Sequence, residues 1–335
     1  MRTFTKILMI ACLMISWTVS AQEESSLEIS GSVDTYYKYD FSGQNNQPTW
    51  FMTDHNSVSL GMIDLAVAKT TGKASFVGEL ALGPRGDGAR DESDAATSPG
   101  AIQNLYVSYA FTDHLSVTAG FMGTFVGYEV ISPLANFNYS GSYLFSHGPF
   151  QNSGVKLDYR ISDKISVMLG LFSSTWDSYS ADPELGMDQL GAQLSLSPAD
   201  GWDVYVNYIN GSQFTQWDVT TSYQISEPLY LGLNVSQNTK YGGIDSGFFG
   251  LAGYAQYGIS ESFALGARFE NFSEGEGDAK QTVNSFTLSG NIFAGPLTII
   301  PEFRMDASDA DVFKDKDDES TDSFSQIGIA AVYSF

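Results

Sequence analysis

Apolar and polar residues alternate in short runs along the chain, from about residue 26 to the C-terminus. The clearest run is VKLDYRI at residues 155–161, and the apolar positions resume at residues 165–171 after a three-residue turn. Because successive side chains of a strand point to opposite faces, this pattern predicts antiparallel hairpins with one apolar face. The chain is therefore predicted to be all-β.

Counting these runs predicts about sixteen strands, within a range of about fourteen to eighteen. The second run changes phase near Gly61 and Met62, which predicts a β-bulge at that point. The expected strands are residues 26–40, 56–69, 72–83, 101–111, 114–123, 151–161, 165–175, 188–197, 201–210, 216–226, 229–239, 248–259, 262–273, 281–293, 296–307 and 323–335.

The connections between these strands alternate between short and long. Outer-membrane barrels have this arrangement, with tight periplasmic turns at one end and long external loops at the other. A strand of about 11 residues tilted by about 40° rises roughly 28 Å, which matches the hydrocarbon thickness. We therefore expect a transmembrane antiparallel up-and-down β-barrel. Its long loops are predicted at residues 41–55, 84–100, 124–150, 176–187, 211–215, 240–247, 274–280 and 306–322.

Residues 124–150 form the longest connection and show no simple alternation. Loops of this length inside a compact fold are usually functional or disordered. Disordered segments contain few aromatic residues, whereas this loop is rich in Phe and Tyr. The sequence therefore indicates an ordered loop with a function, and we take it as a candidate pore constriction.

Both ends of the chain carry features of an outer-membrane protein. Residues 1–21 read as a cleaved signal peptide, with Arg2 and Lys6 before an apolar stretch of about 13 residues, shorter than the about 20 that a membrane helix needs. Residues 22–335 are then a single barrel domain. Tyr333 and the terminal Phe335 close an alternating strand that resembles the signal recognised by the barrel-assembly machinery.

The composition excludes several classes of function. The chain has 39 Asp and Glu against 16 Lys and Arg, a formal net charge of −23, which argues against binding to nucleic acid. The single cysteine, Cys12, lies in the predicted signal peptide, so disulfides and thiol chemistry are not expected in the barrel. No motif indicates a cofactor, and none is expected.

Charged residues on the predicted strands indicate a polar interior. A charge facing lipid at mid-depth costs about 2–4 kcal/mol, so these side chains are expected to face a water-filled lumen. A set of about sixteen strands is wide enough for an aqueous channel. The same charges could instead be salt bridges that brace the barrel. Together with polar residues of the 124–150 loop, the candidate pore-lining residues are Glu129, Asn136, Asn138, Tyr139, Lys156, Asp158, Arg160, Arg268, Glu270, Glu302, Arg304 and Asp306.

Four stretches of the sequence resemble the OmpL-like β-barrel porin family of Gram-negative outer membranes. They are residues 31–41 (GSVDTYYKYDF), 78–88 (GELALGPRGDG), 119–145 (AGFMGTFVGYEVISPLANFNYSGSYLF) and 148–159 (GPFQNSGVKLDY). The resemblance implies an outer-membrane pore of unassigned substrate. It implies no catalytic residues.

Two other functions remain open. His55 and His147, with Asp54, could form a hydrolase site in external loops, although no spacing brings them together; His114 lies in a predicted periplasmic turn. The acidic runs at residues 87–94 and 315–322 could bind Ca²⁺ or Mg²⁺, but they lack EF-hand spacing and are better explained as solvated loops. No catalytic and no metal residues are assigned.

The second open function is that of a closed structural or adhesive barrel, which would bind partners through its loops.

The sequence is best interpreted as an outer-membrane porin for passive diffusion of small polar solutes or ions. In general porins the third loop folds into the bore, and residues 124–150 are the third long loop. We expect Glu129, Asn136, Asn138 and Tyr139 to meet solute, whereas Leu134, Phe137 and Phe145 would anchor the loop to the wall. By analogy with general porins, a homotrimer in the outer-membrane lipid is also expected.

Overall fold

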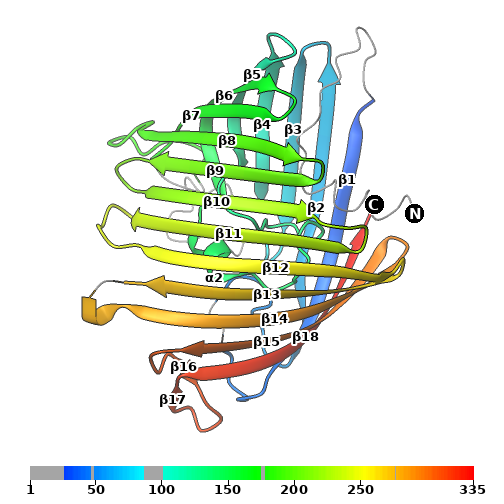
Figure 1. Cartoon of the computed structure of the whole chain (residues 1–335), viewed down its shortest axis with the longest axis vertical. Helices are drawn as coiled ribbons and strands as arrows, with labels where there is room; N and C mark the ends of the chain where they lie inside the picture. Colours follow the sequence, from blue (N-terminus) through cyan, green and yellow to red (C-terminus); the bar gives the residue numbers. More distant parts are fainter. Residues whose placement is uncertain (1–25, 47–48, 87–100, 175–177, 276) are drawn as a thin grey trace.

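The computed structural model describes residues 26–46, 49–86, 101–174, 178–275 and 277–335. These residues form one closed antiparallel barrel in which successive barrel strands pair with each other, and the first strand, β1, pairs with the last, β18 (Figure 1). The barrel strands are β1 Glu28–Asp40, β2 Ser57–Thr71, β3 Ala74–Leu82, β4 Ile102–Ala110, β5 Leu115–Gly123, β6 Gln151–Ser162, β7 Ile165–Phe172, β8 Gln189–Ala199, β9 Trp202–Asn210, β10 Thr215–Gln224, β11 Leu229–Lys240, β12 Phe248–Ser260, β13 Phe263–Glu274, β14 Gln281–Ala294, β15 Leu297–Ser308 and β18 Ser323–Ser334.

The structure confirms the predicted all-β fold and each of the sixteen predicted strands. The ring is closed by β1 and β18, which pair from Ser32 with Ser334 to Asp40 with Gln326. The predicted signal peptide, residues 1–21, and the acidic run at residues 87–94 lie outside the described residues.

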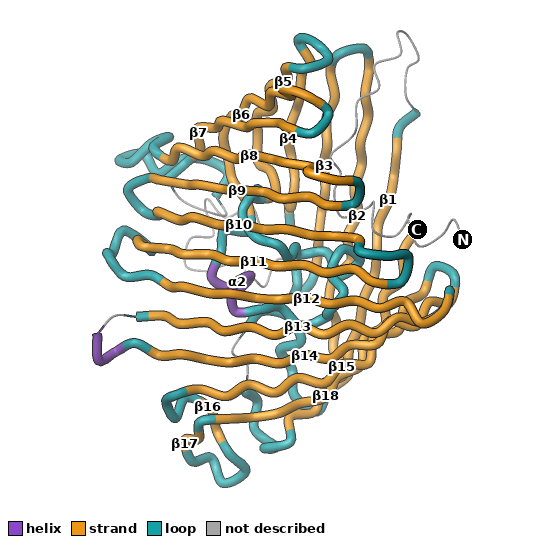
Figure 2. The backbone as a smooth tube through the Cα atoms, in the orientation of Figure 1, coloured by secondary structure: helices purple, strands orange, loops and turns teal. Residues whose placement is uncertain are grey.

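The two ends of the barrel differ, as the alternation of short and long connections predicts. Tight turns join the strands at one end, and the long loops lie at the other (Figure 2). One loop contains a small hairpin of β16 (Phe313–Lys314) and β17 (Ser320–Thr321), and another contains the 3-10 turn η2 (Gly277–Ala279). The helix α2 (Tyr143–His147) belongs to the 124–150 loop and lies within the ring, against β12 and β13. In the described part of the chain, no helix is long and apolar enough to cross a membrane.

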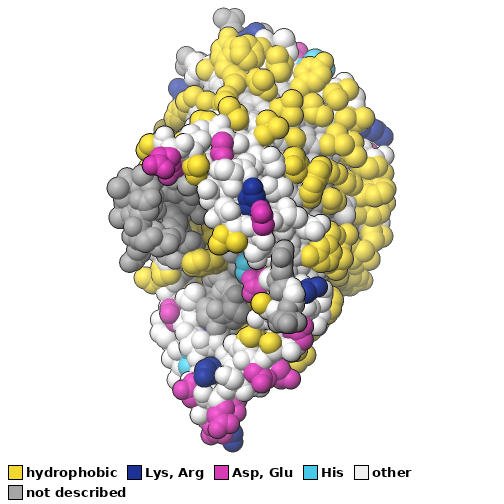
Figure 3. Space-filling view, turned by 90° about the vertical axis from the view of Figure 1, so that its left-hand side faces the viewer, with side chains coloured by type: hydrophobic (Ala, Val, Ile, Leu, Met, Phe, Trp, Pro, Cys, Tyr) yellow, Lys and Arg dark blue, Asp and Glu magenta, His cyan; other side chains and the backbone are white. Residues whose placement is uncertain are grey.

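The outer face of the barrel is apolar because every second strand residue points toward lipid. On β6, for example, Val155, Leu157, Tyr159 and Ile161 are exposed on the outside, and the polar residues between them face inward. Viewed from the side that carries the long loops, apolar side chains cover the flank of the barrel, and acidic side chains lie over the loops (Figure 3).

The predicted β-bulge is confirmed at the second strand. Val33 pairs with Ile63 and Thr35 pairs with Leu60, so Gly61 and Met62 of β2 together face Asp34 of β1. The N–H of Met62 donates to the Asp34 carboxylate at 2.9 Å. The bulge therefore makes room for an inward-facing acid at the junction of the first two strands.

Replacing Gly61 by Ala should destabilise the barrel. A Cβ at this position would lie 1.7 Å from Oδ2 of Asp34, so the buried carboxylate would have to leave its hydrogen bonds or the bulge would have to shift, at a cost of about 1–3 kcal/mol. The matched control is Gly253→Ala on the outer face of β12, where a Cβ meets nothing within 4 Å. The unfolding temperature of each variant is measured from its heat-modifiable electrophoretic mobility in detergent. Equal unfolding temperatures for the two would contradict this interpretation of the bulge.

Candidate pore constriction

The 124–150 loop, called loop 3 below, leaves β5 and returns to β6. Its base is closed by a hydrogen bond from the N–H of Thr124 to the carbonyl of Phe150 at 3.0 Å. The first limb follows the inner wall, where Gly127 N–H donates to Asp218 of β10 at 3.0 Å. Further along, Tyr128 stacks on Tyr254 of β12 with a centroid distance of 4.3 Å. Loop 3 thus lies along the wall from its first residues.

Arg268 of β13 is the central anchor of loop 3. Its Nη1 donates to Oε1 of Glu129 at 2.6 Å and to the carbonyl of Ser140 at 2.7 Å. Its Nη2 donates to the carbonyl of Gly141 at 3.2 Å and to the hydroxyl of Thr287 at 3.1 Å. The side chain of Arg268 is fully buried, so removing it would leave Glu129 as an uncompensated charge.

Two glutamates of the wall bind backbone N–H groups of the loop. Glu302 accepts from Tyr139 at 2.8 Å and from Ser140 at 3.2 Å. Glu270 accepts from Tyr143 and Leu144, both at 2.8 Å. These N–H groups lie at the start of α2 or shortly before it, and charge-assisted hydrogen bonds of this kind are about twice as strong as neutral ones.

Arg304 joins loop 3 to the wall and to the first loop, residues 41–56. It forms an ion pair with Asp306 at 2.8 Å, and Asp306 also accepts from the hydroxyl of Tyr143 at 2.8 Å. Nη1 of Arg304 donates to Thr49 of the first loop and to the carbonyl of Gly141. The first and third loops are therefore held by one guanidinium group.

A second cluster lies near the bulge. Tyr139 donates its hydroxyl hydrogen to Asp34, and Arg85 forms an ion pair with the same carboxylate at 3.8 Å. The guanidinium carbon of Arg85 lies 3.8 Å from the ring centroid of Phe51 and 4.3 Å from that of Tyr139. Burial raises the pKa of Tyr139 and that of Tyr143 above the ordinary phenol value, so both remain neutral donors.

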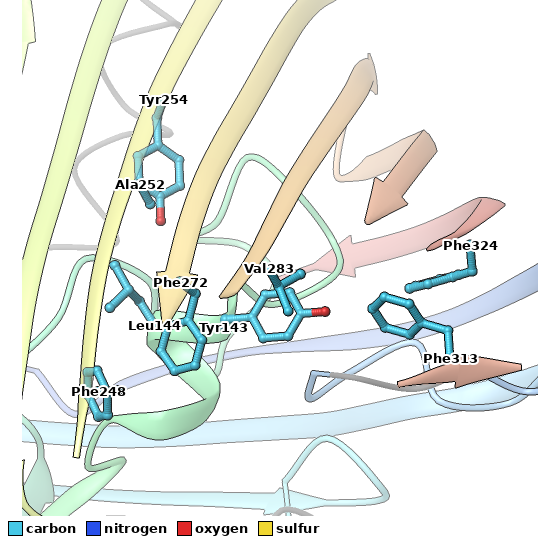
Figure 4. Close-up of a cluster of buried hydrophobic side chains, with 9 residues drawn as sticks. All are labelled: Tyr143, Leu144, Phe248, Ala252, Tyr254, Phe272, Val283, Phe313 and Phe324. Carbon is cyan, nitrogen blue, oxygen red and sulfur yellow. The ribbon is translucent and has the colours of Figure 1, made fainter. Parts of the chain in front are cut away.

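Apolar contacts complete the attachment of loop 3. Tyr143 and Leu144 pack against Phe272 and Phe248 of the wall, and Tyr143 stacks on Phe272 at 5.5 Å (Figure 4). The ring of Phe137 lies so close to Gly266 that a Cβ there would be 2.2 Å from it. Of the three expected apolar anchors, Phe137 and Leu134 pack on the wall, whereas Phe145 packs on Phe51 of the first loop and on Phe150.

Comparison with known proteins identifies the family. Residues 26–335 match the family described as beta-barrel porin-2, OmpL-like. The chain belongs to this porin family. The match confirms the resemblance found in the sequence, and this porin is an outer-membrane protein.

Solved structures share the fold of this porin. OmpT of Vibrio cholerae matches with a TM-score of 0.61 at 12% identity, over 95% of this chain and 99% of that chain. The outer membrane channel DcaP of Acinetobacter baumannii matches with 0.60 at 14%, over 94% and 100%. OmpF of Salmonella typhi, in complex with daunomycin, matches with 0.58 at 14%, over 93% and 100%. Among the curated proteins there is no match.

The structure corrects the expectation for the polar residues of loop 3. Glu129, Asn138 and Tyr139 are 8%, 4% and 2% exposed, so they bind the wall and do not face solute. Asn136 is partly exposed, but its amide is bonded to the backbone of Val130. These polar residues are buried because a polar wall requires polar partners, which loop 3 supplies.

The predicted pore-lining residues of the strands divide into two groups. All of them face inward. In the first group, loop 3 covers the wall of β13 and β15, so the side chains are at most 4% exposed and do not contact the open lumen. This group consists of Arg268, Glu270, Glu302, Arg304 and Asp306. On the opposite wall, Lys156 and Asp158 keep 27% and 39% of their side chains exposed, and Arg160 is also partly exposed. Two anchors were missed: Asp218, which the alternation of its strand could have indicated, and Arg85, for which the sequence gives no signal.

The histidines have separate partners. Nδ1 of His147 is hydrogen-bonded to the carbonyl of Tyr143 at 2.8 Å, and its Nε2 lies 3.2 Å from Glu274. Nδ1 of His55 accepts from the N–H of Asp40 at 3.0 Å. The geometry therefore gives no support to a shared hydrolase site. Within the described ranges, no group of three or more His, Cys, Asp and Glu side chains is placed to hold a metal ion.

Replacing Arg268 by Met should release loop 3. The change leaves Glu129 buried without its partner, at a cost of about 3–5 kcal/mol. We expect new protease cleavage within residues 129–147 of the folded protein and a lower unfolding temperature.

The control for this experiment is Lys156→Met. Its ion pair with Asp158 is partly exposed and contributes about 0–1 kcal/mol. The double variant Arg268→Met with Glu129→Leu should regain part of the lost stability, because it removes both buried charges. Unchanged protease resistance of Arg268→Met would refute the role of this residue as an anchor.

Proposed function

We propose that this porin is a passive channel for small polar solutes and ions, in which loop 3 forms a fixed constriction. The main support is the asymmetry of the inner wall. Arg268, Glu270 and Arg304 are at most 1% exposed beneath loop 3, while Lys156 and Asp158 on the far wall remain in contact with water. The solute route in this proposal runs between loop 3 and the wall of β2–β7.

Loop 3 acts in this proposal as a static element. Its anchors to β13 and β15 are buried charge-assisted hydrogen bonds, and its anchor to β10 is partly buried. All of them would have to break for the loop to swing out. The part that faces the route is the segment from Val130 to Asn136, because its residues are exposed or partly exposed except for Pro133. This segment would narrow the passage without closing it.

The channel function also fits what is absent from the loops. The separate partners of His55 and His147 favour a non-enzymatic protein over the hydrolase alternative. An adhesive barrel without flux would leave the water-exposed charges of β6 without a purpose. In this proposal the partners are small solutes, outer-membrane lipid and the barrel-assembly machinery, which would recognise Tyr333 and Phe335. One solved OmpT structure is a trimer, and we propose a homotrimer here as well.

Planar-bilayer recording on the purified, heat-modifiable protein tests the channel. We expect stepwise insertions with a stable conductance, and the fixed loop should keep the current free of large closures at low voltage. Crosslinking in detergent should give a trimer. A folded barrel that inserts without any conductance would exclude the diffusion function.

Deleting residues 131–135 should raise the single-channel conductance. The deletion joins Val130 to Asn136, which are already hydrogen-bonded to each other, so the anchors at Glu129 and at residues 138–144 are kept. It removes the bond from Arg85 to the carbonyl of Ile131 and the packing of Leu134. The removed residues lie on the partly exposed segment, and their loss widens the passage. Trimming loop residues 316–317 of the external hairpin, far along the chain from loop 3, serves as control. A conductance equal to wild type would show that loop 3 is only a cover.

A further inference from the structure

Lys69 of β2 lies on the lipid-facing side of the barrel. It pairs with Phe76 of β3, which is exposed on the outer face together with Leu65 of the same strand as Lys69. Directly paired residues of neighbouring strands share one face of a sheet, so Lys69 also points outward. In the half of the barrel that carries the tight turns, it is the only Lys, Arg, Asp or Glu at an outward-facing position of the described strands. A charge on this face is costly unless it reaches the interface or finds a partner.

The depth of Lys69 matches the periplasmic headgroup region. The tight turns of an outer-membrane barrel are periplasmic, and β2 ends at Thr71, two residues after Lys69. With a rise of about 3.3 Å per residue and a tilt of about 40°, Lys69 lies roughly 5 Å from the end of the strand. A lysine stem at this depth can follow apolar surface while its ammonium group reaches the interface. Among the described residues, none forms an ion pair or a hydrogen bond with this ammonium group.

A groove of about 480 Å³ extends from Lys69 over the outer surface of β3, β4 and β5. Small side chains, Ala74 and Ala119, lie in it beside the larger rings of Phe76 and Tyr109, and this difference in size creates the hollow. Lys69 is the only charged residue among those that line it. The groove is therefore an apolar channel on the lipid face with a single cation at one end.

A second lysine lies at the periplasmic rim of this groove. Lys73 directly precedes Ala74, and its Nζ donates to the carbonyl of Phe111, just beyond β4, at 2.9 Å. The bond holds the ammonium group of Lys73 beside the turn between β4 and β5. That turn contains one acid, Asp113, whose carbonyl accepts from Arg160 at 2.8 Å. An anion at the rim of the groove would therefore meet two lysines.

The cations of the periplasmic rim are concentrated on this side of the barrel. They lie on β2, on β6 or in the turns that follow these strands, and they are Lys69, Lys73, Arg160 and Lys164, against the two acids Asp113 and Asp163. The turns that follow β8, β10, β12 and β14 contain no Lys or Arg, and their acids are Asp200, Glu227 and Glu261. This distribution favours an anionic ligand at the groove.

We propose that the groove binds an anionic phospholipid of the periplasmic leaflet, with its phosphate group at Lys69 and Lys73 and an acyl chain along Phe76 and Tyr109. The inference deepens the proposed role of outer-membrane lipid as a partner and does not depend on conduction. A second copy of the chain is a poorer occupant, because the outward-facing described strand residues of this half offer no carboxylate to Lys69.

Headgroup charge distinguishes the proposed ligand from other phospholipids. A zwitterionic headgroup carries its own cation, which competes with Lys69 for the phosphate group and is repelled by both lysines. A headgroup with a net negative charge has no such cation. The groove should therefore select by charge, while its apolar lining accepts the acyl chains of either lipid.

Native mass spectrometry of the full barrel tests this selection. The protein in detergent receives equal amounts of phosphatidylglycerol and phosphatidylcholine with the same acyl chains. Wild type should retain more phosphatidylglycerol, and Lys69→Met should lower this preference about fivefold, the usual contribution of one lysine near an anionic surface. Lys69→Arg should keep the preference. The control is Lys164→Met, which removes an exposed lysine from the same rim outside the groove and should bind as wild type does.

A second variant tests the groove without changing its charge. Ala119→Phe places a ring in the hollow and should lower the total amount of bound lipid. Each variant is also crosslinked in lipid-free detergent and checked for heat-modifiable mobility. A wild type that binds both lipids equally, or a Lys69→Met variant with the wild-type ratio, overturns the proposal. It is also overturned if Lys69→Met and Ala119→Phe weaken self-association and leave lipid binding unchanged, since a second copy then occupies the groove.

Discussion

The closure of the sheet is the constraint on which the rest of this structure depends. A bilayer offers no hydrogen-bond partner to backbone N–H and C=O groups, so a strand left at an open edge would be unstable. Pairing of β1 with β18 removes that edge. Once the ring is closed, the pleat assigns each strand position to lipid or to lumen. Charged strand residues such as Arg268 and Glu302 are thereby committed to the interior.

This commitment explains why loop 3 is held by charges. An apolar loop placed on a wall that contains Arg268, Glu270 and Arg304 would bury charged groups without partners. Loop 3 instead supplies carbonyls to the guanidinium groups and backbone N–H groups to the carboxylates. Apolar contacts such as Tyr143 on Phe272 then fill the spaces between these bonds. The polar wall and the polar loop require each other.

The sequence was sufficient for the barrel because strand alternation is a local signal. Each strand repeats the same period of two, and the bulge at Gly61 and Met62 was visible as a break in it. The path of loop 3 was not predictable in this way. The bond between Arg268 and Glu129 joins residues far apart in sequence, and no local pattern relates them. The inward position of Arg268 was predictable, but its coverage by loop 3 depends on tertiary packing.

A fixed loop changes what can determine selectivity. If loop 3 does not move, the field that a solute meets is set by static charges on the uncovered wall. Many charged residues lie beneath loop 3, but most of their charges are neutralised in pairs, as the ion pairs of Arg268 with Glu129 and of Arg304 with Asp306 show. The formal net charge of −23 is therefore a poor guide to the lumen, because many of its acids lie in the loops. An exposed charge on the route, such as Lys156 or Asp158, has more influence than a larger number of buried pairs or distant loop charges, since the interaction falls with separation and is screened by salt.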